Sequence, residues 1–243
     1  MEKSNNRIYF LDVLRGIAVI GMVFHHALVS AEIVFGVTFD FLYTVVFQVL
    51  QLLFVCIFLL VSGICTRFSR SVLKRGLVVF GAALIVSFAT CVVLPAMNFS
   101  GLNIYFGILH MFGLSMIIYA LCQKWLDKLN PVFAILLFSA LFFAYYFYYL
   151  TQPIADTWLL LPFGVLSSDI TSYGDYYPLF PYMFMFLVGT YIGKYVKEGK
   201  APNWFYTFRF KPFEFCGKYS LFVYVFHQPI IFGTFYLISM LKG

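Results

Sequence analysis

Long stretches without charged side chains constrain this chain more than any other feature. Residues 76–123 contain no Asp, Glu, Lys or Arg. A helix needs about 20 mainly apolar residues to cross a bilayer. This stretch therefore predicts two spans, with Pro95 and Gly101 in the turn between them. Of the 243 residues, 63% are apolar or aromatic and 11% are charged, against roughly 25% charged in a soluble domain. Together these features exclude a soluble globular protein, a disordered chain and a β-barrel of short alternating strands.

The apolar runs predict an all-α polytopic membrane bundle of about seven helices in a single domain, residues 1–243. The expected spans are 11–29, 43–65, 77–94, 104–122, 132–150, 179–195 and 219–241. Residues 158–166 form a further apolar piece that is too short to cross, so we expect it to be re-entrant or interfacial. The basic, aromatic loop 198–218 is expected to lie on the membrane surface.

The positions of lysine and arginine predict the orientation. Fifteen of the 16 lie at the N-terminus or in every second loop, and only Lys242 departs from this split. Basic loops stay on the cytoplasmic side, so we expect the N-terminus inside and the C-terminus outside. The net charge of +6 is then a topology signal and does not point to nucleic acid. A bacterial-type cytoplasmic membrane is the expected location.

The first span carries polar groups that do not belong in lipid. Asp12 and Arg15 are three residues apart and could pair on one helix face. Eleven residues separate Arg15 from His26, which is close to three whole turns, so both share a face about 16 Å apart along the axis. Such groups in a membrane helix mark either a functional path or a structural lock. His26, with His25 beside it, is either a proton-accepting imidazole or a polar residue at the interface.

Two further histidines lie within predicted spans. His110, between Gly107 and Gly113, is expected in the outer half of the fourth span, either as a functional group or as a hydrogen-bonded residue at a helix crossing. His227 precedes Gln228 and Pro229 and is expected in the inner half of the seventh span. Proline frees a backbone carbonyl there, which is typical of a polar cavity or simply of a kink.

Two groups of loop residues are candidates for substrate contacts. The basic residues after the second span could bind phosphates or only set the orientation. They are Arg67, Arg70, Lys74 and Arg75. Carboxylates and tyrosines of the outer loop, with His25, could contact a sugar, although tyrosine is also common at membrane interfaces. They are Asp169, Tyr173, Asp175 and Tyr177. No carboxylate–histidine cluster has the spacing of metal ligands, so no metal is expected.

Five ordered stretches carry a resemblance to a known family. The chain resembles bacterial membrane proteins related to heparan-α-glucosaminide N-acetyltransferase. Its first and last stretches are also similar to the acyltransferase type 3 membrane proteins. The stretches are 7–18 with Met22 and His26, 58–63 (FLLVSG), 106–110 (FGILH), 177–181 (YPLFP) and 217–230 (GKYSLFVYVFHQPI). Seven predicted spans are fewer than the ten or eleven of characterised relatives.

The resemblance implies transmembrane acyl transfer. In those families acetyl-CoA or another acyl-CoA is used from the cytoplasm, and the acceptor is an amine or hydroxyl of a sugar or glycan on the far side. His26 matches the first-helix histidine, as a general base or a transient acyl carrier, and Arg15 matches the arginine before it. We expect Asp12 to hold Arg15, and His110 and His227 to assist from the two halves of the membrane. Membrane lipids are the expected partners, and a homo-oligomer is one option.

Two other classes of protein could use the same residues. A small lipid or sugar transporter, or a flippase, would need buried polar groups as a substrate path. A haem protein would need two histidine ligands. Thiol release from acyl-CoA distinguishes a transferase from a transporter, and a Soret band would identify haem.

Overall fold

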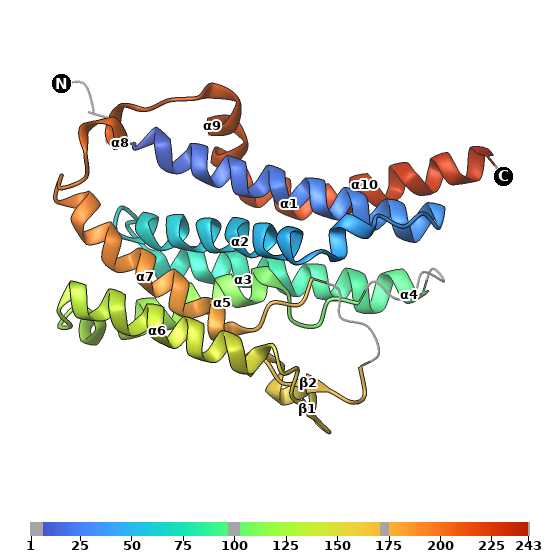
Figure 1. Cartoon of the computed structure of the whole chain (residues 1–243), viewed down its shortest axis with the longest axis horizontal. Coiled ribbons are helices and arrows are strands. Elements are labelled where there is room, and N and C mark those ends of the chain that lie inside the picture. The colour runs from blue at the N-terminus through green and yellow to red at the C-terminus, as the bar shows by residue number, and fades with distance from the viewer. Residues whose placement is uncertain (1–6, 97–102, 171–174, 243) are drawn as a thin grey trace. The chain divides into compact units, whose positions relative to one another are not determined.

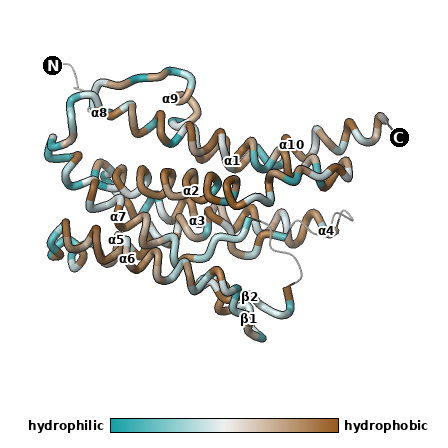
Figure 2. The backbone as a smooth tube through the Cα atoms, in the orientation of Figure 1, coloured by the Kyte–Doolittle hydropathy of each residue, from teal (hydrophilic) through white to brown (hydrophobic). Residues whose placement is uncertain are grey.

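Helices make up most of the structure, a computed structural model that describes residues 7–96, 103–170 and 175–242 (Figure 1). Among these residues, seven helices are long and apolar enough to cross a membrane. They are α1 (Tyr9–Phe35), α2 (Val45–Thr66), the continuous run Val72–Ala96, α5 (Ile108–Leu126), α6 (Pro131–Tyr149), α7 (Leu179–Lys197) and α10 (Ser220–Lys242). The run Val72–Ala96 consists of α3 (Val72–Phe88), a π-helical turn (Ala89–Val93) and α4 (Leu94–Ala96). The seven predicted spans are confirmed, and Figure 2 shows hydrophobic residues dominating along them.

Local sequence explains where several helices begin and end. The side chain of Asn130 accepts hydrogen bonds from the backbone N–H groups of Val132 and Phe133, and Pro131 occupies the first turn of α6. Helix α1 ends at Phe35 and is capped by Gly36, whose left-handed conformation (φ 64°) suits a residue without Cβ. This ending extends α1 six residues beyond the predicted span, since the polar residues around Glu32 remain helical.

The chain divides into two compact units, Met1–Val61 with Lys200–Gly243, and Ser62–Gly199. Helix α2 begins in the first unit, and its last residues belong to the second. The single domain over residues 1–243 stays a prediction.

The first unit is built around α1, which packs against α10 and against the short helix α9 (Lys211–Lys218). Glycine permits the contact with α9. A Cβ on Gly217 would collide with the backbone carbonyl of Asp12, and one on Gly16 would collide with that of Phe213. The loop expected only to lie on the membrane surface therefore contains two short helices, α8 (Asn203–Thr207) and α9, and α9 is anchored on α1.

In the second unit α3 packs against α5, α6 packs against α7, and α5 contacts α7. Fully buried aromatic side chains fill this core, namely Tyr119, Phe142, Phe186 and Tyr191. The short apolar piece does not form a membrane-length helix. It is a 3-10 helix, η3 (Trp158–Phe163), between two-residue strands β1 (Ile154–Ala155) and β2 (Leu166–Ser167), which pair in parallel.

Candidate functional site

Three histidines meet in the first unit. The ring centroid of His26 lies 5.0 Å from that of His227 and 5.5 Å from that of His25. His227, which the sequence places in the inner half of the seventh span, is therefore in direct ring contact with the histidine of the first span. Because Gly217 lies against Asp12 and Gly16, α10 begins partway along α1, and His227 is level with His26.

One ring nitrogen of His227 is hydrogen-bonded, and the other has no hydrogen-bond partner among the described residues. Nδ1 lies 2.6 Å from the backbone carbonyl oxygen of Tyr224. A carbonyl only accepts, so Nδ1 carries the proton and Nε2 bears a lone pair. Nε2 is buried and has no hydrogen-bond partner among the described residues. A buried acceptor without a partner is costly in a folded protein, so this atom is a candidate contact for a ligand or reactant.

Gln228 adds a second available acceptor. Its Nε2 donates to Ser30 Oγ over 3.1 Å, while its Oε1 is buried without a partner in the described part of the chain. Pro229 removes the backbone N–H that would bond the carbonyl of residue 225. We call the set His25, His26, Ser30, His227 and Gln228 the α1–α10 polar cluster. Sequence reasoning did not predict Ser30 or Gln228, although the polar residue beside Pro229 was a usable signal.

The predicted pairing of Asp12 with Arg15 is confirmed. Arg15 Nη1 lies 3.5 Å from Asp12 Oδ1, and Asp12 is 6% exposed. Arg7, which sequence reasoning did not assign, makes the shorter contact, with Nε 2.6 Å from Asp12 Oδ2. The Asp12 backbone also carries the contact with Gly217. The Asp12 carboxylate thus pairs with two cations, while the Asp12 backbone carbonyl lies at the α1–α9 contact.

His110, in the second unit, has both ring nitrogens in hydrogen bonds. Nδ1 accepts from the backbone N–H of Gly107 over 3.2 Å, and Nε2 lies 3.2 Å from Ser87 Oγ. The Ser87 hydroxyl donates its proton to the carbonyl of Ile104, so Nε2–H is the donor to Ser87. This arrangement favours the structural interpretation of His110, a cap on the first turn of α5.

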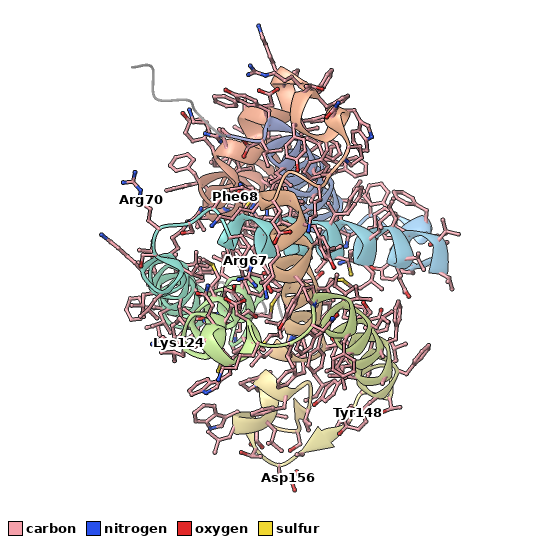
Figure 3. All side chains as sticks on the ribbon, turned by 90° about the vertical axis from the view of Figure 1, so that its left-hand side faces the viewer. Arg67, Phe68, Arg70, Lys124, Tyr148 and Asp156 are labelled. Atoms are coloured by element: carbon pink, nitrogen blue, oxygen red, sulfur yellow. The ribbon has the colours of Figure 1, made fainter. Side chains whose placement is uncertain are left out.

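The four basic residues expected to bind phosphate do not form one patch. Arg67 is buried, with Nη1 2.7 Å from Asp127 Oδ1 and Nε donating to the carbonyl of Thr190 over 2.8 Å. Lys194 Nζ lies 3.1 Å from the same Asp127 oxygen. Figure 3 shows Arg67 among the helices and Arg70 pointing away from them. The side chains that remain exposed are Arg70, Lys74 and Arg75.

Asp127, just after α5, is the acidic centre of this ion cluster. Partial burial acts to raise its pKa, but hydrogen bonds and charge from Arg67 and Lys194 outweigh burial and hold the pKa below its usual value. The carboxylate therefore stays ionised, and we call Arg67, Asp127 and Lys194 the ion cluster of the second unit.

The residues expected to contact a sugar belong to both units. Asp175 approaches Gly107, and Tyr177 N–H donates to the carbonyl of Phe106 over 3.4 Å, so this segment packs next to the start of α5. Asp169 is exposed, and Tyr173 lies outside the described residues. His25 belongs to the other unit and stacks on Phe47 with ring centroids 5.8 Å apart.

The membrane-length helices, and the charged and titratable side chains buried among them, define a polytopic helical membrane protein with polar groups inside each unit. The chain belongs to the family described as "Heparan-alpha-glucosaminide N-acetyltransferase, catalytic", whose model matches residues 7–229. This match confirms the resemblance and assigns the chain to a family of membrane acetyltransferases. No curated protein and no solved structure matches the chain. Within the described residues, no group of three or more His, Cys, Asp or Glu could hold a metal ion.

Proposed function

We propose that this protein transfers an acetyl group from cytoplasmic acetyl-CoA to an amine or hydroxyl of a sugar on the far side of a bacterial cytoplasmic membrane. Family membership supports the acetyl group and the sugar acceptor. The observation that carries the proposal is the buried, unpartnered Nε2 of His227, oriented by Tyr224 and in ring contact with His26.

His227 Nε2 is suited to act as the general base. It accepts a proton from the acceptor amine or hydroxyl as that nitrogen or oxygen attacks the thioester carbonyl carbon. The carbon–sulfur bond then breaks, the acetyl group stays on the acceptor, and the departing CoA sulfur takes up the proton. His26 lies beside the reacting atoms in this scheme, as a second base or as the residue that carries the acetyl group between donor and acceptor.

The remaining polar residues provide binding and support. Asp12 holds Arg15 at the end of α1 that we expect to be cytoplasmic, where the donor arrives. Exposed Arg70, Lys74 and Arg75 stay candidates for the CoA phosphates, whereas Arg67 is already engaged by Asp127. Asp169, Asp175 and Tyr177 stay candidates for the sugar, with His25 nearer the imidazole pair.

The test measures release of the CoA thiol by full-length protein in lipid nanodiscs, with acetyl-CoA as donor and glucosamine as acceptor probe. We expect His227→Ala to lower the rate by about 10²–10⁴-fold, the usual contribution of a general base, and His26→Ala to do the same. Thr234→Val is the matched control on α10, because this exposed hydroxyl only bonds the carbonyl of Ile230.

Radiolabelled acetyl-CoA separates the two roles of His26. A label retained on wild type and on His227→Ala, but lost in His26→Ala, identifies His26 as the acyl carrier. A His227→Ala protein with the wild-type rate would refute the proposal. Wild-type protein that releases no thiol would favour the transporter or flippase, in which the α1–α10 polar cluster serves as a substrate path.

A further inference from the structure

Helix α9 has one face that is held against α1. Gly217 lies against the backbone of Asp12, and Glu214 is buried. Arg209 grips Glu214 through two hydrogen bonds, from Nε to Oε1 over 3.2 Å and from Nη2 to Oε2 over 2.9 Å. The guanidinium of Arg209 also lies 3.5 Å from the ring centroid of Tyr9. These contacts fix which face of α9 is turned away from α1.

The outward face is basic and aromatic. Lys211, Phe215 and Lys218 recur at i, i+4 and i+7, which places them on one helix face. All three are exposed, Phe215 to 64%. Tyr219 follows, with its ring centroid 4.9 Å from that of Phe215 and 5.1 Å from Lys218 Nζ. We call these four residues the α9 stripe.

The segment before α9 continues the same chemistry. Trp204, Phe208 and Phe210 are exposed to 56%, 46% and 46%. Exposed aromatic rings interleaved with lysines are typical of protein surfaces at the headgroup level of a membrane. The positive charges predict that this segment lies on the cytoplasmic side, where anionic lipids give the leaflet a negative surface potential.

We propose that the α9 stripe binds the headgroups of anionic phospholipids. Glu214 neutralises Arg209, so Lys211 and Lys218 supply the net positive charge of this helix. A phospholipid can contact both kinds of side chain in the stripe. Its phosphate binds the lysines, and its acyl chains cover Phe215. A soluble phosphate compound would leave Phe215 in water. The α9 stripe is independent of the imidazole pair, so it does not rest on the proposed acyl transfer.

Native mass spectrometry of the full-length protein in detergent tests this site, with phosphatidylglycerol and phosphatidylcholine supplied in equal amounts. Wild type is expected to retain phosphatidylglycerol preferentially. Each lysine near an anionic surface adds about fivefold in binding, so Lys211→Gln with Lys218→Gln should lower the preference by about that factor per lysine. Lys124→Gln with Lys128→Gln is the matched control, because both are exposed lysines of another predicted cytoplasmic loop.

Further variants distinguish a loss of charge from a loss of folding. Competition with CoA distinguishes a lipid headgroup from a soluble phosphate compound. Lys211→Arg with Lys218→Arg keeps both charges and is expected to keep the preference. Phe215→Ala is expected to weaken retention of both lipids. An equal loss in both double-glutamine variants would overturn the proposal, since it would reflect net charge alone. An unchanged preference in the Lys211/Lys218 variant would also overturn it, as would displacement of phosphatidylglycerol by excess CoA.

Discussion

Two buried histidines of this protein differ in what their ring nitrogens do. His110 uses both, with Gly107 N–H and Ser87 Oγ as partners. His227 uses only Nδ1, and its Nε2 is buried without a partner among the described residues. A protein tolerates such an atom where a ligand or reactant completes its hydrogen bonding. At this scale His227 is a candidate for chemistry and His110 a candidate for stability.

Replacing His110 tests that contrast. His110→Ala leaves the buried N–H of Gly107 without its acceptor, and an unsatisfied buried group costs about 1–3 kcal/mol. It also removes the hydrogen bond from His110 to Ser87, which keeps its bond to Ile104. We expect a clearly lower thermal unfolding midpoint in detergent, followed by circular dichroism. His227→Ala removes a side chain that bonds only to backbone groups of its own helix, and it is expected to shift the midpoint less. A His110→Ala protein as stable as wild type but inactive would instead support the catalytic role predicted from the sequence.

At the scale of elements, the contact between α9 and α1 controls the polar cluster. The first residues of α10 follow directly from α9, and the depth of His227 therefore depends on where α9 is anchored. The anchor is a pair of close backbone approaches at Gly16 and Gly217. Small residues permit such approaches between helices.

Gly217→Ala is expected to disrupt this anchor. The new Cβ would collide with the carbonyl of Asp12, which belongs to the α1 backbone and cannot rotate away. Overpacking of this kind costs about 1–3 kcal/mol or more, and thiol release should fall as His227 moves away from His26. Gly233→Ala on α10 is the control, because no atom lies within 4 Å of its added Cβ. Alanine favours a helix by about 0.5–1 kcal/mol over glycine, so this control should be as stable as wild type or slightly more so. Equal behaviour of the two variants would argue against the anchor.

At the scale of the molecule, spanning helices need polar contacts at their ends as well as apolar packing. In the second unit the ion cluster joins three segments, with Arg67 after α2, Asp127 after α5 and Lys194 within α7. All three belong to regions that the positive charges predict to be cytoplasmic. Their meeting at one end of this unit agrees with the predicted orientation, which itself stays a prediction.

The ion cluster predicts an acid limit to stability. The pKa of Asp127 is lowered in the folded protein, because Arg67 and Lys194 outweigh the effect of burial. Its contribution is therefore complete above the unfolded pKa of about 3.9 and is lost as the pH falls through the lower folded value. Solvent screens the partly exposed carboxylate, so Asp127→Asn should reduce the free energy of unfolding by about 1 kcal/mol at neutral pH. The difference from wild type should shrink below about pH 4.

Unfolding by denaturant at pH 7, 5 and 3.5 measures this difference. Asp156→Asn is the control, since Asp156 is exposed and accepts one hydrogen bond from Ser168. A difference between wild type and Asp127→Asn that stays constant down to pH 3.5 would show that the charge of Asp127 does not stabilise the fold.

The helices and part of the candidate site were predictable from the sequence. The seven spans were predictable because a bilayer requires an apolar run of fixed length, which is a local property of the chain. The Asp12–Arg15 pair was predictable for the same kind of reason, since three residues along a helix fix the neighbours. The sequence did not predict that Arg67 would be enclosed in the ion cluster while Arg70, Lys74 and Arg75 stay exposed. Charge alone does not distinguish a buried cation from an exposed one.

The contact of His26 with His227 depended on the tertiary structure. These residues are separated by some two hundred positions, and their depths match only because α9 folds back along α1 before α10 begins. The hydrogen bond from Gln228 to Ser30 also joins residues far apart in the sequence, and so do the ion pairs of the ion cluster. Both therefore depend on tertiary packing. Local sequence determines which segments become helices and where polar groups interrupt them. Which polar groups meet is decided by backbone contacts at a few glycines, and these depend on the packing of whole helices.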